Sequence, residues 1–391
     1  MDPLRLPTVP PPAPATHPWR DRALIAIVAV LLPVMATLDP LRGAAIRWEQ
    51  RRASAWPPAA MLASPAKFGA AFGQAFADRF GMRSALIVGQ HWALVDIFGV
   101  SPVATVMIGR DGWLFWLGED AQSLDRHYRG TRTVPDFEAD AYVAEVKRRH
   151  EYLRSRGIAY LTTIVPEKFT IYPEHLPSWV APGRNPTLLA RTVDRLAEDG
   201  SVPYVDLRPL LRDAKGREQL YYLTDSHWNL AGAGVASVAI MQAVQTLLPG
   251  RVASIARPVR PPYTPGRDVY WGDLSRAMGI PFRFTEPDYL PLAATRNPRR
   301  ASLLARSITP NRESRIRIYE QPNVDLPRLV MNRDSMGIWL IPLLSENFHR
   351  SVYMLSTALE RETIEREHPD IVIDEIVERG MLRIAQSPTL P

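Results

Sequence analysis

The chain has 391 residues, enough for one large domain with appendages or for two smaller domains. It contains no cysteine, which excludes disulfides, thiolate nucleophiles and cysteine-ligated metals. The net charge is +6, but there is no dense basic run and no nucleic-acid motif, so nucleic-acid binding is not expected. Nearly all of the positive charge is arginine, which suits an ordinary solvated surface and also an anionic polysaccharide or lipid surface.

The first predicted element is an apolar segment near the N-terminus. A proline-rich tail, residues 1–22, precedes an uncharged run, Ala23–Leu38, that has charged residues on both sides. No small-x-small cleavage site follows the run directly, so we expect an uncleaved signal anchor over residues 23–39. A cleaved signal and a buried helix are the alternatives. Flanking arginines on both sides leave the orientation open, and a large C-terminal domain can be translocated regardless of them.

These features predict a single-pass membrane protein. The short tail would lie in the cytoplasm and the main domain on the other side of the membrane. Residues 40–66 are expected to form a linker, and residues 67–391 the main domain. Within that domain, aromatic residues at helical spacing run from Phe68 toward Ile97, and a Gly-Arg-Asp-Gly turn joins two short strands over residues 107–115.

Helices and strands then alternate along the chain. The expected helices cover residues 136–157, 186–199, 229–248 and 357–367, and the expected strands cover residues 158–165, 202–207, 329–331, 351–355 and 371–373. Asp136 is the predicted cap of the first of these helices. Alternation of this kind predicts an α/β fold with a mainly parallel, doubly wound sheet. Residues 255–325, rich in proline and arginine, are expected to form an irregular insertion beside the site.

The most informative stretch is Thr224-Asp225-Ser226-His227-Trp228-Asn229, just before a predicted helix. In an extended segment, Asp225 and His227 lie on one face, where the carboxylate can fix the imidazole tautomer. A metal site with these two residues as ligands is the alternative. No third ligand is recognisable, so no metal is expected.

Ser335 comes directly after a predicted buried strand and before Gly337. At the carboxyl end of a parallel strand, its hydroxyl can act as a nucleophile when a base is nearby. The alternative is that Ser335 caps the following helix. An acid, a base and a serine together favour acyl transfer through an ester intermediate.

Several motifs resemble, in the same order, those of the alginate O-acetyltransferase AlgJ/AlgX-like family of the SGNH hydrolase-like superfamily. They extend over about residues 68–382. The matching segments are Asp78–Arg83, Gly109–Phe115, Pro166–Pro177, Asp225–Asn229 with Gly232-Ala233, Arg333–Ser335 with Phe348, and His368–Ile373 with Glu378-Arg379.

The resemblance implies an SGNH-like three-layer α/β/α sandwich. It implies Ser335 as nucleophile, His227 as general base and Asp225 as the residue that orients His227. Acetyl groups from a membrane-bound O-acyltransferase would be transferred to hydroxyls of an exopolysaccharide, without a cofactor. The resemblance also implies a bacterial inner membrane for the anchor and the periplasm for the main domain. An acetyl esterase and a catalytically silent scaffold of an export complex are the alternatives.

Three further residues are predicted to bind substrate: Lys168, Tyr172 and Arg333. For Lys168 and Tyr172 the alternative is structural, with the lysine on a backbone carbonyl and the tyrosine in the core. Arg333 stands where many SGNH enzymes have glycine. It could obstruct an oxyanion site or help to bind a uronate.

Overall fold

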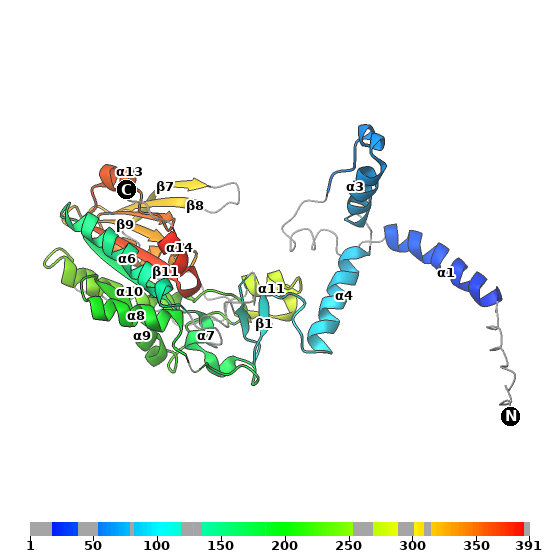
Figure 1. The fold of residues 1–391 in the computed structure, drawn as a ribbon, viewed down its shortest axis with the longest axis horizontal. Helices are drawn as coiled ribbons and strands as arrows, with labels where there is room; N and C mark the ends of the chain where they lie inside the picture. Colours follow the sequence, from blue (N-terminus) through cyan, green and yellow to red (C-terminus); the bar gives the residue numbers. More distant parts are fainter. Residues whose placement is uncertain are drawn as a thin grey trace, which may run out of the picture. The chain divides into compact units, whose positions relative to one another are not determined.

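A computed structural model of the chain describes residues 18–37, 54–78, 82–118, 128, 135–183, 185–252, 269–287, 301–308 and 314–386. The chain divides into two compact units, Met1–Trp92 and Ala93–Pro391 (Figure 1). The predicted domain boundary at residue 67 therefore lies inside the first unit. Residues 1–17 of the predicted tail and residues 38–53, at the end of the predicted anchor and in the linker, are outside the described residues.

The first unit is helical. It contains α1 (Pro18–Thr37), the short 3-10 helix η1 (Ala59–Ala63), α3 (Pro65–Ala77) and most of α4 (Arg83–Asp96). On α3 the predicted aromatic spacing places Phe72 between Phe68 and Phe76, with ring centroids 5.9 and 6.3 Å apart. Residues four apart share one face of a helix, so the three rings form a single stripe.

The second unit is built on a seven-stranded sheet, in the order β4-β3-β11-β9-β10-β8-β7. Neighbours among the first five strands are parallel, β8 is antiparallel to β10, and β7 is antiparallel to β8. The bounds are β3 (Ala159–Val165), β4 (Tyr204–Asp206), β7 (Ser302–Ile308), β8 (Ser314–Glu320), β9 (Arg328–Arg333), β10 (Arg350–Leu355) and β11 (Ile371–Val377). The mainly parallel sheet that helix–strand alternation predicts is confirmed.

Helices cover both faces of this sheet and make three layers (Figure 1). One face packs against α6 (Asp136–Arg154), α8 (Leu188–Asp199) and α14 (Met381–Gln386). The other packs against α9 (Leu207–Ala214), α10 (Leu230–Leu247) and α12 (Ile341–Leu344). Because β9 is covered on both sides, Leu329 and Met331 enter one core and Val330 the other.

Shorter elements complete the unit. The hairpin of β1 (Val106–Ile108) and β2 (Leu114–Trp116) has the predicted turn, in which Asp111 and Gly112 both have positive φ and Trp113 N–H donates to the Arg110 carbonyl. The other short elements are α7 (Lys168–Ile171), η3 (Pro173–His175), η6 (Met336–Trp339), η7 (Ser345–Asn347), α13 (Arg361–Glu367) and η8 (Glu378–Gly380).

The expectation for residues 255–325 was wrong over its described parts, because regular elements occupy them. These are β5 (Val269–Tyr270), α11 (Asp273–Ala277), η4 (Pro281–Arg283), β6 (Glu286–Pro287), and the strands β7 and β8 of the main sheet. Strand β8 holds alternating Arg and Ile residues, Arg315 to Ile318, and β7 holds a short apolar run, Leu303–Ala305. The high arginine and proline content of the region obscured both patterns.

Two local predictions also need correction. The residue before α6 is Pro135, and Asp136 lies in the first helical turn instead of capping the helix. Helix α9 follows β4 directly and was not predicted.

Among the described helices, α10 is the one that is long and apolar enough to cross a membrane by length and composition. Half of it (50%) is buried inside the protein. Its Ala233, Ile240 and Val244 belong to the core, so we interpret α10 as a core helix.

Candidate active site

The carboxyl ends of the parallel strands bring several charged residues to one edge of the sheet. Glu167 and Lys168 follow β3, Asp334 and Ser335 follow β9, and Arg379 lies just after β11. Ligands bind at this edge in parallel α/β folds. The candidate site is assembled here from three separate parts of the chain.

The loop between α9 and α10 carries the histidine. An antiparallel bridge between Tyr221 and Trp228 closes this loop, and the Tyr222 N–H donates to the His227 carbonyl at 3.2 Å. Asn229 caps α10, since its Oδ1 accepts from the N–H groups of Ala231 and Gly232 at 2.9 and 3.2 Å. The loop geometry and the helix start therefore fix the place of His227.

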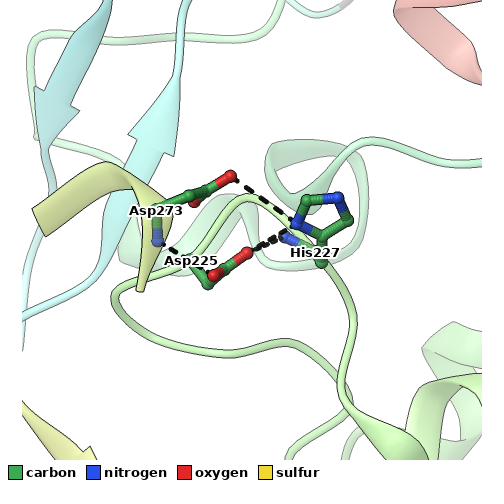
Figure 2. A group of neighbouring side chains, drawn as sticks. All are labelled: Asp225, His227 and Asp273. Carbon is green, nitrogen blue, oxygen red and sulfur yellow. Dashed lines mark hydrogen bonds and ion pairs between the residues drawn. The ribbon is translucent and has the colours of Figure 1, made fainter. Parts of the chain in front are cut away.

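His227 and Asp225 form a close pair (Figure 2). The imidazole Nδ1 lies 2.6 Å from Asp225 Oδ1, which also accepts the His227 backbone N–H at 3.0 Å. With Nδ1 held by the carboxylate, Nε2 lies on the opposite side of the ring, away from both carboxylates in Figure 2. The predicted proximity of Asp225 and His227 is present, and it leaves Nε2 as the atom that can accept a proton.

The second oxygen of Asp225 is held by residues from the region that was expected to be irregular. Tyr270 donates its hydroxyl to Asp225 Oδ2 at 2.6 Å, and the Asp273 N–H donates to the same oxygen at 2.9 Å. Asp225 is only 5% exposed and accepts four hydrogen bonds. Neither Tyr270 nor Asp273 was identified from the sequence, because no local motif marks them.

A second carboxylate, that of Asp273, also faces the imidazole. Its Oδ2 lies 3.6 Å from His227 Nδ1 and accepts the Ser226 hydroxyl at 2.5 Å, while Oδ1 accepts the Ser226 N–H at 2.7 Å. The two carboxylates differ in environment, since the side chain of Asp273 is 44% exposed. Ser226, which lies between Asp225 and His227 in the sequence, donates two hydrogen bonds to Asp273.

Asp273 is the third potential metal ligand that the sequence did not reveal. Ligand atoms of Asp225, His227 and Asp273 lie within 4.8 Å of one another. However, both oxygens of Asp225 already accept two donors each, and Nδ1 faces that carboxylate. A carboxylate filled with N–H and O–H donors is suited to orienting an imidazole, and a divalent cation would have to displace those donors.

The electrostatics agree with this arrangement. Burial alone would raise the pKa of Asp225, but the hydrogen bond and charge of His227 outweigh it and hold that pKa well below its usual range. Burial alone would lower the pKa of His227, yet Asp225 and Asp273 reverse the effect, so that the pKa is raised. Burial and the charge of Asp225 raise the pKa of Asp273. The imidazolium is thus stabilised by two neighbouring carboxylates.

Ser335 lies in the turn between β9 and η6. Asp334 shapes this turn, since its Oδ1 accepts the Met336 N–H at 2.8 Å and its Oδ2 accepts the Val377 N–H at 2.7 Å. Ser335 precedes η6, but its side chain makes no capping hydrogen bond, which removes the capping alternative. Within the described part of the chain, the Ser335 hydroxyl has no hydrogen-bond partner and remains available for other chemistry.

One contact ties the serine turn to the histidine loop. Trp228, next to His227 and fully buried, donates its indole Nε1–H to the carbonyl of Met336, next to Ser335, at 3.0 Å. No hydrogen bond joins Ser335 to His227 among the residues that the structure describes. The serine–histidine contact of the predicted triad therefore stays a prediction.

Lys168 and Tyr172 have the structural role that was the alternative to substrate binding. Lys168 is 2% exposed, and its ammonium donates to the carbonyls of Tyr222, Leu223 and Asp225 at 2.9, 3.1 and 2.6 Å. Tyr172 is buried and accepts the Leu220 N–H on its hydroxyl at 2.9 Å. Burial, only partly offset by Glu286 and other carboxylates, lowers the pKa of Lys168 to about 8.

Arg333 is also buried, with 3% of its surface exposed. It donates to the Asp334 carbonyl at 2.8 Å and packs beside Gly337, where an added Cβ would lie 2.7 Å from Arg333 Cβ and 2.4 Å from Glu375 Oε2. Arg333 also lines a cavity of about 460 Å³ at the carboxyl ends of β9 and β10. Arg333 stands where many SGNH enzymes have glycine. Because Gly337 has no side chain, it leaves the room that Arg333 needs.

Comparison with known proteins agrees with this fold. Residues 106–311, more than half of the chain, match the family described as SGNH hydrolase-like domain, acetyltransferase AlgX. The matched span includes Asp225, His227 and Asp273 and ends before Ser335.

Two relatives share part of the sequence, and a solved structure shares the fold. The chain is 30% identical over 147 residues to a probable alginate O-acetylase AlgJ of Pseudomonas putida, covering 37% of this chain and 36% of that protein. It is 30% identical over 129 residues to the AlgJ of Pseudomonas aeruginosa, covering 33% and 30%. The matches thus span about a third of each relative's length. Bacillus cereus PatB1 has a similar fold, with a TM-score of 0.52 at 12% identity over 71% of this chain and 96% of PatB1. The chain belongs to the AlgX-type SGNH hydrolase-like family.

Proposed function

We propose that this protein is an O-acetyltransferase that acts on hydroxyl groups of an exopolysaccharide. The observation that supports this most is the Asp225–His227 pair at 2.6 Å, beside a serine turn whose hydroxyl has no partner in the described structure. The names of the AlgJ relatives, which refer to alginate O-acetylation, supply the substrate class.

In the proposed first step, Ser335 Oγ attacks the carbonyl carbon of an acetyl donor. The hydroxyl proton passes to His227 Nε2 and then to the leaving group, which departs as the acetyl–serine ester forms. In the second step, a sugar hydroxyl attacks the ester, giving its proton to Nε2, and Oγ recovers a proton. Asp225 keeps Nδ1 protonated and stabilises the imidazolium in both steps.

Location and donor are parts of the same proposal. Helix α1 has 20 residues, with the charged residues Arg20, Asp21 and Arg22 near its start. Its uncharged part, from Ala23 to Thr37, is about 22 Å long at 1.5 Å per residue, shorter than a bilayer core of about 30 Å, so the charged flanks would lie at the lipid head groups. Its side chains at Ile25, Val28 and Val30 are exposed. We infer that α1 anchors the chain in a bacterial inner membrane with the main domain in the periplasm. The anchor would hold the site near a membrane-bound O-acyltransferase that supplies acetyl groups.

A burst experiment tests the acyl-transfer step. The full-length protein in detergent is given p-nitrophenyl acetate, and nitrophenolate release is followed for the wild type and for Ser335→Ala. We expect a burst in the wild type and none in the variant. Faster turnover with added acceptor oligosaccharide supports a transferase, whereas turnover that acceptors do not change indicates an esterase.

A non-enzymatic scaffold is the second candidate, favoured by the absence of a Ser335–His227 hydrogen bond among the described residues. Catalytic hydrogen bonds often form only when substrate is bound, so this observation is compatible with an enzyme as well. Polymer acetylation in cells that carry Ser335→Ala separates the two. Acetylation at the wild-type level in such cells would exclude both the transferase and the esterase that act through Ser335, and would leave the scaffold.

A further inference from the structure

Two buried charges of opposite sign hold the turn that carries Asp225 and His227. Lys168, from α7, and Glu286, from β6, are 2% and 3% exposed. They come from segments more than a hundred residues apart, and both bind the backbone of the same few residues. Buried charges are costly unless hydrogen bonds satisfy them, so their placement on one turn needs an explanation.

Lys168 binds the carbonyl side of this turn. Its three N–H donors match the three carbonyls of Tyr222, Leu223 and Asp225, so the ammonium is filled by protein acceptors. The shortest contact, at 2.6 Å, is to the carbonyl of Asp225 itself. No N–H of Lys168 is left for a substrate.

Glu286 binds the N–H side. Its Oε2 accepts the Leu223 N–H at 2.9 Å, and its Oε1 accepts the Thr224 N–H at 2.8 Å and the Thr224 hydroxyl at 2.7 Å. The neighbouring Gly272 N–H also donates to the Thr224 hydroxyl, at 3.0 Å. The Glu286 carboxylate thus accepts hydrogen bonds from N–H groups of this turn, and the Lys168 ammonium donates hydrogen bonds to carbonyls of the same turn.

We propose that Lys168 and Glu286 are a pair of positioning residues that hold Asp225 against His227 Nδ1 from opposite sides of the turn. This rests on the proposed function, since positioning matters only if His227 acts as a base. Neither residue reaches a substrate. Each acts through the backbone of residues 222–225, which sets where the Asp225 carboxylate lies.

The first test measures acylation. Burst rate constants with p-nitrophenyl acetate are compared for full-length wild type, Lys168→Met, Glu286→Gln and the double variant, each checked for folding by circular dichroism. A displacement of about 1 Å in catalytic geometry can cost about 100-fold in rate, so we expect a loss of 10- to 100-fold in each single variant. The double variant should lose little more than the worse single variant, because both changes release the same turn.

Lys215→Met is the matched control. Lys215 is also tied to a backbone carbonyl, that of Ile171 at 2.6 Å, but it does not contact residues 222–225. Its replacement should leave the burst unchanged. Folded Lys168→Met and Glu286→Gln proteins with the burst rate of the wild type would overturn the proposal.

The second test uses the pKa of His227 as a measure of the contact between Asp225 and the imidazole, and it does not depend on catalysis. The pKa of His227 is measured by NMR titration of its ring proton in the wild type and in Lys168→Met. Removing a nearby positive charge would by itself raise this pKa, whereas releasing Asp225 from Nδ1 lowers it. We expect a lowered pKa. A raised or unchanged value would overturn the proposal.

This second test separates the proposal from the proposed function. If Ser335→Ala kept the burst of the wild type, the acetyl-serine mechanism would fail, but the titration would still decide whether Lys168 positions the Asp225–His227 pair. If Lys168→Met did not fold, the acylation rate of Glu286→Gln would decide instead. A rate at least 10-fold below the wild type supports the pair, and an unchanged rate overturns it.

Discussion

At the scale of single residues, the site depends on how one imidazole is shared by two carboxylates. Asp225 is buried and filled with donors, whereas Asp273 is 44% exposed and lies 3.6 Å from Nδ1. Sequence spacing could identify the Asp225–His227 pair, because residues two apart share a face. It could not identify Asp273, which lies 46 positions away from His227 and reaches it only through the fold.

The raised pKa of His227 predicts the pH dependence of acylation. Only the neutral imidazole can accept the serine proton, so the rate should rise with pH through a pKa above the ordinary value of 6.5. In Asp225→Asn this limb should move to lower pH, and the plateau should fall by about 10⁴-fold because the tautomer is no longer fixed. Burst rates over a pH series check both effects. An unshifted limb in Asp225→Asn would contradict the assignment.

Asp273→Asn should have a smaller effect of the same sign. Removing its charge lowers the pKa of His227, while the 2.6 Å bond to Asp225 stays. We expect the acid limb to move to lower pH by less than in Asp225→Asn, with a plateau within about 10-fold of the wild type. NMR titration of His227 in the two variants checks the order. A larger shift in Asp273→Asn would assign the main orienting role to Asp273.

At the scale of elements, the segment β5–β6 supports the histidine loop. The packing between the two segments is tightest at Gly272. A Cβ added there would lie 2.1 Å from both the carbon and the oxygen of the Thr224 carbonyl. Two backbones pass each other here with no room for a side chain. The close packing explains how a proline-rich region with little sequence pattern comes to complete the site.

Gly272→Ala should therefore disturb both stability and activity. The backbone of residues 224–225 or of β5 must shift, and overpacking of this kind costs about 1–3 kcal/mol. We expect a lower free energy of unfolding, measured by urea titration, and slower acylation. Gly216→Ala, which has no atom within 4 Å of the added Cβ, is the control and should change neither. A Gly272→Ala protein as stable and active as the wild type would show that this packing is unimportant.

The elements themselves differed in how far the sequence predicted them. Strands such as β3 and β9 were predictable because burial on both faces favours a nearly continuous apolar run, and α10 because Asn229 marks its start. Strands β7 and β8 lie at the sheet edge beyond β10. Strand β8 alternates apolar with charged residues, and the apolar run of β7 is only three residues long, Leu303–Ala305, so neither strand has a long apolar run. The supporting role of Lys168 could be stated only as an alternative, since no sequence pattern shows what an ammonium contacts.

At the scale of the whole molecule, the chain combines an N-terminal helical unit with an α/β unit that contains the candidate site. The predicted membrane anchor lies in the N-terminal unit. The full-length protein should stay with membranes after alkaline carbonate extraction, and a variant that lacks residues 1–53 should be released. Release of the full-length protein would contradict an uncleaved anchor. A shortened N-terminus, seen by mass spectrometry, would indicate a cleaved signal.

The proposed mechanism requires that Ser335 becomes acetylated. The most direct measurement is peptide mass spectrometry of the full-length protein quenched in acid during the p-nitrophenyl acetate burst. We predict one added acetyl group on the peptide that contains Ser335, absent in His227→Gln and lost when the quenched protein is returned to neutral pH with an acceptor sugar. An unmodified Ser335 in a folded wild-type protein, or equal acetylation in His227→Gln, would contradict the acetyl-serine mechanism.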